Sequence, residues 1–321
     1  GAPGVVYSRR RRAKVTEHVR VVEVGPRDGL QNEREIVPTD AKVELIRRLV
    51  AAGYEDIEVT SFVRPRWIPQ LADASDVLSA LRGVQGATFW ALVPNERGLE
   101  RALGAGLSGV ATFMSASETH NLKNVNRTIR ESLWALREVI GTAVAEGLRV
   151  RAYVSTVLGC PYEGAVSVER AVEIAAALRE MGAEQISLGD TTGMANPKQV
   201  GEVIAAMHAG GLPRSSLAMH MHDTQGAALA NVLAGLQAGV RTFDASIAGL
   251  GGCPYAPGAS GNAASEDLVN MLNNMGYQTG IDLDRLCSAG EFIADVLGRE
   301  LPGRYHKYWL GARARREART A

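Results

Sequence analysis

The sequence predicts an α/β protein, a closed (β/α)8 barrel (TIM barrel) with extra C-terminal helices. A glycine repeatedly separates a helical pattern from a run of β-forming residues, and eight such runs follow one another along the chain. The runs are continuously apolar, which is typical of parallel strands covered on both faces. Because no run is followed by GxGxxG and no obvious linker divides the units, a closed barrel is favoured over a doubly wound sheet.

The expected strands are residues 21–24, 57–59, 88–93, 110–113, 150–154, 186–188, 217–221 and 242–247. The recurring glycines are Gly53, Gly106, Gly147, Gly182, Gly211 and Gly239. Glycine just past a helix adopts the left-handed conformation without a Cβ penalty. Each of these glycines is therefore expected to end one helix shortly before a strand.

Helical periodicity fills the stretches between the strands. Apolar residues at helical spacing follow Thr39 and Ser167, which are expected to cap their helices, and recur from Leu229 to Leu236. We expect an N-terminal tail over residues 1–18, flexible and outside the fold, and a single barrel domain over residues 19–321. Within that domain a helical extension is expected from about Asp282.

Composition excludes several classes of protein. A zero formal net charge and a pI near 7.2 argue against nucleic acid and anionic lipid as partners. No apolar run approaches the roughly 18 residues that a membrane span requires. The cysteines (Cys160, Cys253 and Cys287) form no CxxC pair, which favours a reducing compartment, and the cytoplasm is the expected location.

Polar residues gather where the expected strands end, which is where barrels of this kind carry their chemistry. His220 and His222 are two residues apart on one strand, so both imidazoles point to the same face. Asp28 follows the first strand, and Asn262 offers an amide oxygen. This mixed nitrogen and oxygen set suits Mg²⁺ or Mn²⁺. The alternatives are a hydrogen-bonded pair of structural histidines, and a turn role for Asn262 beside Gly261.

Three further side chains have two interpretations each. Arg27 would either stabilise negative charge on a thioester or carboxyl oxygen, or form a salt bridge to Glu58 or Glu33. A buried Glu58 would need Arg27 or the metal shell as its partner. Cys253 follows a glycine-rich loop, so its thiol would act as a general acid over the barrel mouth or be a small core residue.

Several segments resemble the 3-hydroxy-3-methylglutaryl-CoA (HMG-CoA) lyase family of the DRE-TIM metallolyase superfamily, over about residues 21–279. The matching segments are 24–33 (VGPRDGLQNE), 60–63 (TSFV), 159–164 (GCPYEG), 187–191 (SLGDT), 249–256 (GLGGCPYA) and 258–262 (GASGN). Residues 115–126 depart from the animal members of the family, and this departure bears on the acyl group rather than on the reaction type.

The resemblance implies a divalent-metal-dependent carbon–carbon lyase that cleaves HMG-CoA to acetyl-CoA and acetoacetate, as in leucine degradation and ketone-body formation. It implies one Mg²⁺ or Mn²⁺ held by Asp28, His220, His222 and Asn262. The residues with implied catalytic roles are Arg27, Asp28, Glu58, Asp190, His220 and Cys253. Arg27, Gln31 and His120 are expected to bind the acyl-CoA substrate, and the alternative for His120 is to cap a turn.

Two other activities remain open at this point. One is cleavage of a longer 3-hydroxy-3-alkylglutaryl-CoA. The other is Claisen condensation of the isopropylmalate or homocitrate synthase type, which is disfavoured because little chain follows Asn262. A homo-oligomer is also considered, with the aromatic segment 305–310 either forming the contact or packing into the core.

Overall fold

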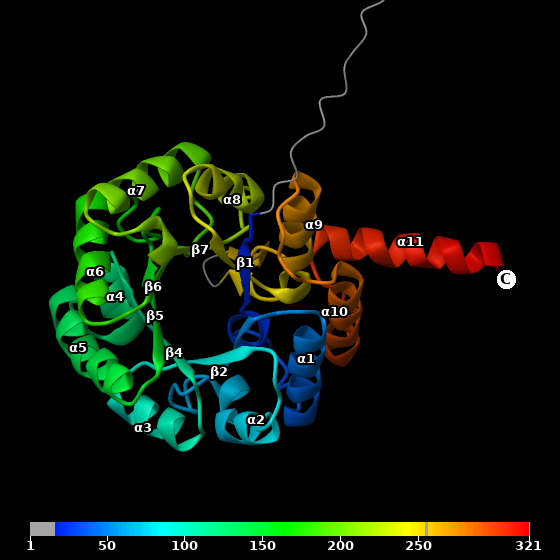
Figure 1. The fold of residues 1–321 in the computed structure, drawn as a ribbon, viewed down its shortest axis with the longest axis horizontal. Helices are drawn as coiled ribbons and strands as arrows, with labels where there is room; N and C mark the ends of the chain where they lie inside the picture. The colour runs from blue at the N-terminus through cyan, green and yellow to red at the C-terminus, as the bar shows by residue number, and fades with distance from the viewer. Residues whose placement is uncertain (1–16, 254–255, 321) are drawn as a thin grey trace, which may run out of the picture.

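The computed structural model describes residues 17–253 and 256–320, without the side chains of residues 253, 256–259 and 320. Eight parallel strands form a closed barrel in which the last strand pairs with the first, as Figure 1 shows. The predicted (β/α)8 fold is therefore confirmed. The predicted tail over residues 1–18 lies almost entirely outside the described residues and stays a prediction.

The strands lie close to their predicted positions. They are β1 (Arg20–Glu23), β2 (Asp56–Ser61), β3 (Thr88–Leu92), β4 (Gly109–Ser115), β5 (Arg149–Ser155), β6 (Gln185–Asp190), β7 (Leu217–Met221) and β8 (Thr242–Ala245). β8 ends before the predicted limit at residue 247, because the chain turns into the short helix η4 (Ile247–Gly249). Beyond η4, β9 (Gly252–Cys253) and β10 (Ala256–Ser260) form a small antiparallel pair.

Helices surround the barrel and continue beyond it (Figure 1). They are α1 (Thr39–Ala51), α2 (Ala74–Ala80), α3 (Glu96–Gly104), α4 (Glu118–Val125), α5 (Ile129–Ala145), α6 (Val168–Glu180), α7 (Pro197–Ala209), α8 (Ala228–Gln237), α9 (Ser265–Met275), α10 (Leu283–Leu297) and α11 (Arg304–Thr320). The predicted helical extension is confirmed: Asp282 caps α10, and α11 projects away from the barrel in Figure 1.

The six predicted helix-ending glycines all have positive φ, between +76° and +116°, which confirms the reason for choosing them. Ser167 caps α6 as expected, accepting from the amide of Arg170 at 3.2 Å. The Thr39 cap is wrong, because Pro38 occupies that position. The Thr39 hydroxyl instead donates to a carboxylate oxygen of Asp73 at 2.7 Å, immediately before α2.

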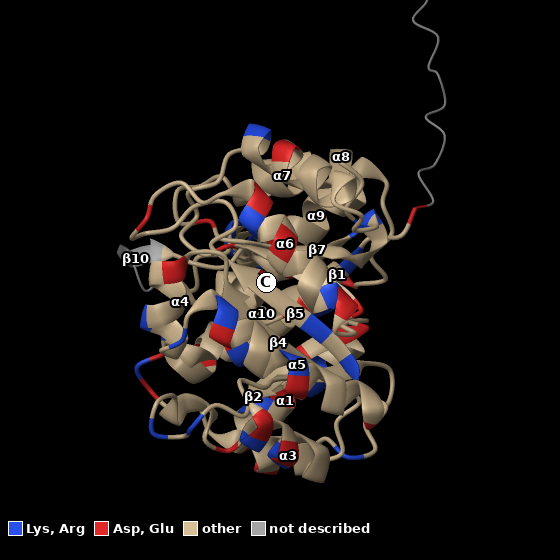
Figure 2. Cartoon of the chain, turned by 90° about the vertical axis from the view of Figure 1, so that its left-hand side faces the viewer, with Lys and Arg blue, Asp and Glu red and all other residues tan. Residues whose placement is uncertain are grey.

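The core is aliphatic and lies between the strands and the helix ring. Lys, Arg, Asp and Glu are interspersed on the face shown in Figure 2, in keeping with the balanced charge of the chain. Among the described helices, none is both long and apolar enough to cross a membrane. The barrel interior itself carries charge, since Arg151 and Asp244 are almost fully buried there as an ion pair.

Candidate metal centre

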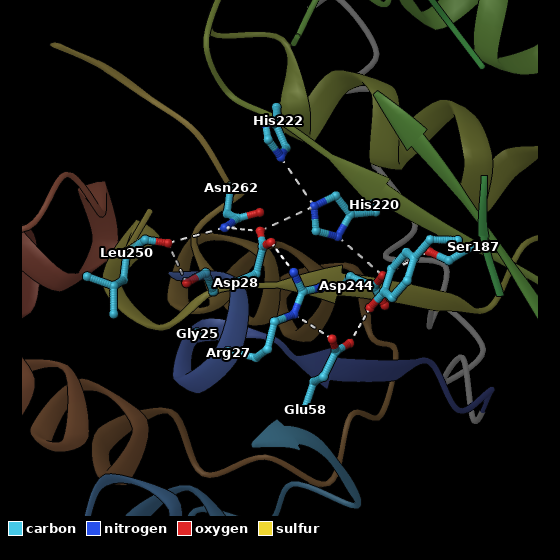
Figure 3. Close-up of polar contacts among 12 residues, drawn as sticks. Gly25, Arg27, Asp28, Glu58, Ser187, His220, His222, Asp244, Leu250 and Asn262 are labelled. Atoms are coloured by element: carbon cyan, nitrogen blue, oxygen red, sulfur yellow. Dashed lines mark hydrogen bonds and ion pairs between the residues drawn. The ribbon is translucent and has the colours of Figure 1, made fainter. Parts of the chain in front are cut away.

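Three predicted ligands converge at the C-terminal end of the barrel. β7 directs His220 and His222 to the same face, and Asp28 reaches them from the short helix η1 (Gly25–Gly29) after β1 (Figure 3). Their ligand atoms all lie within 4.8 Å of one another. His220 Nε2 is 3.2 Å from His222 Nε2 and 3.8 Å from an Asp28 oxygen. The geometry is that of a group able to hold one cation.

Asn262 completes the convergence. Its Nδ2 donates to an Asp28 oxygen at 2.9 Å, and its backbone pairs with that of His222. The oxygen Oδ1 of Asn262 is buried, and no described residue supplies its hydrogen-bond partner. Buried polar atoms are normally satisfied. The lone pairs of this oxygen therefore fit a cation ligand, and Asn262 is more than a turn residue beside Gly261.

The charges around the cluster set its protonation. Burial opposes ionisation of Asp28, but Arg27 and the two imidazoles outweigh it and hold the pKa of that carboxyl well below its usual range. Burial and the neighbouring His220 lower the pKa of His222 to about 4. Metals bind carboxylate and neutral imidazole. Asp28 and His222 are therefore in ligand-competent forms at neutral pH.

Arg27 is held beside the cluster by two carboxylates. Its Nε donates to Glu58 at 2.5 Å, and its Nη1 forms an ion pair with Asp28. The other oxygen of Glu58 accepts from the Tyr153 hydroxyl at 2.5 Å. Glu33 is not a partner of Arg27, because it lies in an ion pair with Arg299. The salt bridge to Glu58 therefore orients the guanidinium without removing it from the site.

Sequence reasoning missed the residues that support His220 from below. Asp244 on β8 lies 3.3 Å from His220 Nδ1, and its other carboxylate oxygen accepts from Arg151 at 2.6 Å. Arg151 also donates to the Tyr153 hydroxyl at 3.2 Å. A carboxylate on the second imidazole nitrogen fixes the orientation of a metal-binding histidine. The available signal was a charged residue inside each of two otherwise apolar strands.

These contacts form a closed cycle of residues, which we call the buried ring. Its members are Arg27, Asp28, Glu58, Tyr153, Arg151, Asp244 and His220, most of which Figure 3 labels. They come from η1, β2, β5, β7 and β8. The ring thus spans the barrel and includes two members of the metal cluster, Asp28 and His220.

Asp190 lies outside the metal cluster. It ends β6, and its carboxylate accepts from the amides of Met194 and Ala195 at 3.0 and 3.3 Å. Burial raises its pKa to about 6. These contacts anchor the loop between β6 and α7.

The remaining predicted residues differ in how they lie relative to the site. Gln31 and His120 line a cavity of about 530 Å³ that also contains Arg27, Asp28 and both metal-cluster histidines. The turn-capping role falls to Ser117, whose hydroxyl accepts from the His120 amide at 3.1 Å. The side chain of Cys253 lies outside the described part of the chain, so its predicted role stays a prediction.

A closed barrel with histidine and carboxylate ligands gathered at its strand ends belongs to the class of metal-dependent barrel enzymes. The chain belongs to the HMGL-like family, whose model matches residues 18–293.

The similar proteins cover most of this chain. The hydroxymethylglutaryl-CoA lyase YngG of Bacillus subtilis is 50% identical over 286 residues, which are 89% of this chain and 95% of that protein. The mitochondrial hydroxymethylglutaryl-CoA lyase of Gallus gallus is 50% identical over 283 residues, covering 88% and 95%. The cytoplasmic lyase of Mus musculus is 48% identical over 88% of this chain and 82% of its own length. Because relatives occur in more than one compartment, the expected cytoplasmic location stays a prediction.

Solved structures of similar proteins have the same fold as this chain. The HMG-CoA lyase of Bacillus subtilis matches with a TM-score of 0.90 and 49% identity, over 91% of this chain and 98% of that one. An HMG-CoA lyase of Acinetobacter baumannii, in complex with coenzyme A and 3-methylmalate, matches with a TM-score of 0.86 and 39% identity. That match covers 90% of this chain and 94% of the other.

Proposed function

We propose that this chain is a divalent-metal-dependent carbon–carbon lyase that cleaves HMG-CoA to acetyl-CoA and acetoacetate. The observation that carries the proposal is the convergence of Asp28, His220 and His222 beside Arg27 in one cavity, in a chain half identical to proteins named for this reaction. Asn262 is the proposed fourth ligand, and the proposed ion is Mg²⁺ or Mn²⁺. A bound ion would polarise substrate oxygens and lower the pKa of the C3 hydroxyl.

The side chains around the cluster have different proposed roles in the reaction. His220 and Asp28 are the two candidates for accepting the proton of the C3 hydroxyl, after which the C2–C3 bond breaks and the acetoacetate carbonyl forms. Arg27 faces the negative charge that develops on the thioester oxygen as the acetyl-CoA enolate forms. Glu58 keeps the guanidinium in place. Protonation of the enolate carbon is assigned to Cys253.

Substrate binding is assigned to the cavity walls. Gln31 and His120 both line the cavity. The side-chain oxygen Oε1 of Gln31 is buried and has no hydrogen-bond partner among the described residues. It is therefore available to a donor group of the substrate. Asp190 is proposed to act indirectly, by fixing the loop after β6.

The oligomeric state remains a proposal. Within residues 305–310, Trp309 donates to Asp284 at 2.7 Å, whereas Tyr308 is 65% exposed. The segment is therefore partly packed, and its exposed part remains available for a contact between two copies of the chain.

The test is product identification with the purified protein, HMG-CoA and Mg²⁺ or Mn²⁺. We expect acetoacetate without release of a free thiol, whereas a condensing enzyme supplied with its own substrates would release one. His222→Ala should abolish turnover and His208→Ala, on α7, should not. The proposal fails if the metal-supplied protein forms no acetoacetate. A steady-state comparison with longer 3-alkyl analogues then fixes the acyl group.

A further inference from the structure

The segment between α10 and α11, residues 298–303, passes the loops at the mouth of the barrel. We call it the α10–α11 linker. The Gly303 amide donates to the Ala248 carbonyl oxygen in η4 at 2.8 Å. Arg304, the first residue of α11, lies 3.7 Å from a carboxylate oxygen of Asp223 in the loop after β7. The family-model match ends at residue 293, so this part of the mouth lies beyond it.

Arg299 joins the α10–α11 linker to the loop after η1. Gly298, in the left-handed conformation with φ 63°, ends α10, and the guanidinium of the next residue contacts Glu33. Both carboxylate oxygens take part, because Nη2 of Arg299 forms an ion pair with Oε1 and its Nε donates to Oε2 at 3.4 Å. A two-point contact between guanidinium and carboxylate fixes orientation as well as distance.

Glu33 also contacts the loop after β2. It is the last residue of the segment VGPRDGLQNE, and the proposed reaction gives it no role. Its backbone carbonyl oxygen accepts from Gln70 Nε2 at 2.6 Å, and the Gln70 carbonyl oxygen accepts from the buried Lys42 at 2.5 Å. Gln70 follows Trp67 and Ile68, which line the catalytic cavity. Glu33 therefore connects two loops that form the wall of this cavity.

The residues just before Glu33 belong to the cavity wall itself. Gln31 and Asn32 both line the cavity. Residues 32–36 are turn, bend and irregular chain, so they lack the repeated backbone hydrogen bonds that fix a helix or a strand. The position of this wall therefore depends on side-chain contacts such as the one between Arg299 and Glu33.

We propose that Arg299 is a positioning residue for the reaction and holds the substrate-facing wall of the cavity through Glu33. The inference rests on the proposed function, which supplies the substrate that this wall contacts. Arg299 does not appear among the described residues that line the cavity, so it acts on the wall from outside. Loss of the ion pair should therefore weaken substrate binding and leave the metal cluster intact.

Kinetics and metal binding test this effect together. Arg299→Ala should raise KM for HMG-CoA about fivefold, the order expected for one partly exposed ion pair, with little change in kcat and none in the calorimetric affinity for Mn²⁺. Arg313→Ala is the matched control and should behave as wild type. It breaks a two-point ion pair with Glu291, and the Arg299 and Arg313 side chains are 44% and 36% exposed. An unchanged KM in Arg299→Ala, or a comparable loss of Mn²⁺ affinity, would overturn the proposal.

Exchange of the two charges distinguishes the ion pair from a general structural effect. Arg299→Glu places two carboxylates together and should raise KM more than Arg299→Ala does. Adding Glu33→Arg should restore most of the lost substrate binding, because the hydrogen bond from Gln70 goes to the backbone of residue 33 and survives the exchange. If the double variant binds substrate no better than Arg299→Glu alone, Arg299 does not act through this pair.

Amide hydrogen exchange separates this proposal from the proposed reaction, because it requires no turnover. In Arg299→Ala, exchange should become faster in residues 31–36 and stay unchanged in β7. If the wild-type protein forms no acetoacetate but the variant shows this faster exchange, the positioning contact stands and the reaction falls. If the protein cleaves HMG-CoA but Arg299→Ala changes neither exchange nor KM, the positioning role falls alone.

Discussion

The carboxyl group of Glu23 supports a quantitative prediction about stability. Glu23 ends β1 and is fully buried, with one oxygen accepting from the amides of Gly25 and Ile247, both at 2.8 Å. Its other oxygen accepts from the Ser265 hydroxyl at 2.6 Å. Burial outweighs these hydrogen bonds and raises the pKa of Glu23 from 4.5 to about 7.

This pKa shift determines in which direction the stability of the fold changes with pH, and by how much. Below the unfolded pKa both states carry the proton, so no stability is lost. Between pH 4.5 and about 7 the unfolded carboxyl ionises while the folded one retains its proton, so stability falls as pH rises. At about 1.4 kcal/mol per pKa unit, the loss is on the order of 3 kcal/mol.

Glu23→Gln is the suitable perturbation. Its carbonyl oxygen can accept from both amides and its amide can donate to Ser265, so the hydrogen bonds survive without a group that ionises. We expect urea unfolding at pH 5 and pH 8 to show that the free energy of unfolding of the variant, relative to that of the wild type, is larger at pH 8. Glu138→Gln, on the exposed face of α5, is the control. A wild-type-minus-variant difference that is the same at both pH values would refute the reasoning.

Three further predictions concern the buried ring. Arg27→Gln should abolish acetoacetate formation while leaving the thermal unfolding midpoint within a few degrees, and gross unfolding would make its role structural. Asp244→Asn removes the charged partner of His220 Nδ1 and should weaken Mn²⁺ binding roughly 10- to 100-fold by calorimetry; unchanged affinity would exclude the orienting role. Tyr153→Phe leaves one Glu58 oxygen without its donor and should cost about 1–3 kcal/mol in urea unfolding, so an unchanged midpoint would contradict the contact.

The features that the sequence predicted correctly depend on local rules. A glycine such as Gly182 stops a helix because of its own backbone freedom, so its effect is visible in a short window. His220 and His222 share a face because strand side chains alternate, and Asp28 joins them because barrel strands end together. None of these inferences needs a distance between remote residues.

The missed features depend on which strands face one another across the barrel. Asp244 pairs with Arg151 across 93 positions of sequence, and Tyr153 reaches Glu58 across 95. No residue near Asp244 in the sequence indicates that Arg151 is its partner. The Thr39 cap failed for a local reason, because Pro38 occupies the cap position. The contact that the Thr39 hydroxyl makes instead, with Asp73, depends on the fold.

The buried ring also limits how this barrel can be divided. A cut between β4 and β5 would leave Arg27, Asp28 and Glu58 in one fragment and Tyr153 and His220 in the other. The cut would break the hydrogen bond from Tyr153 to Glu58 and the contact between His220 and Asp28, so each half would keep buried polar groups whose partners lie in the other half. Half-barrel fragments of this chain are therefore expected to be poor autonomous folding units, and to acquire native structure only on reassociation.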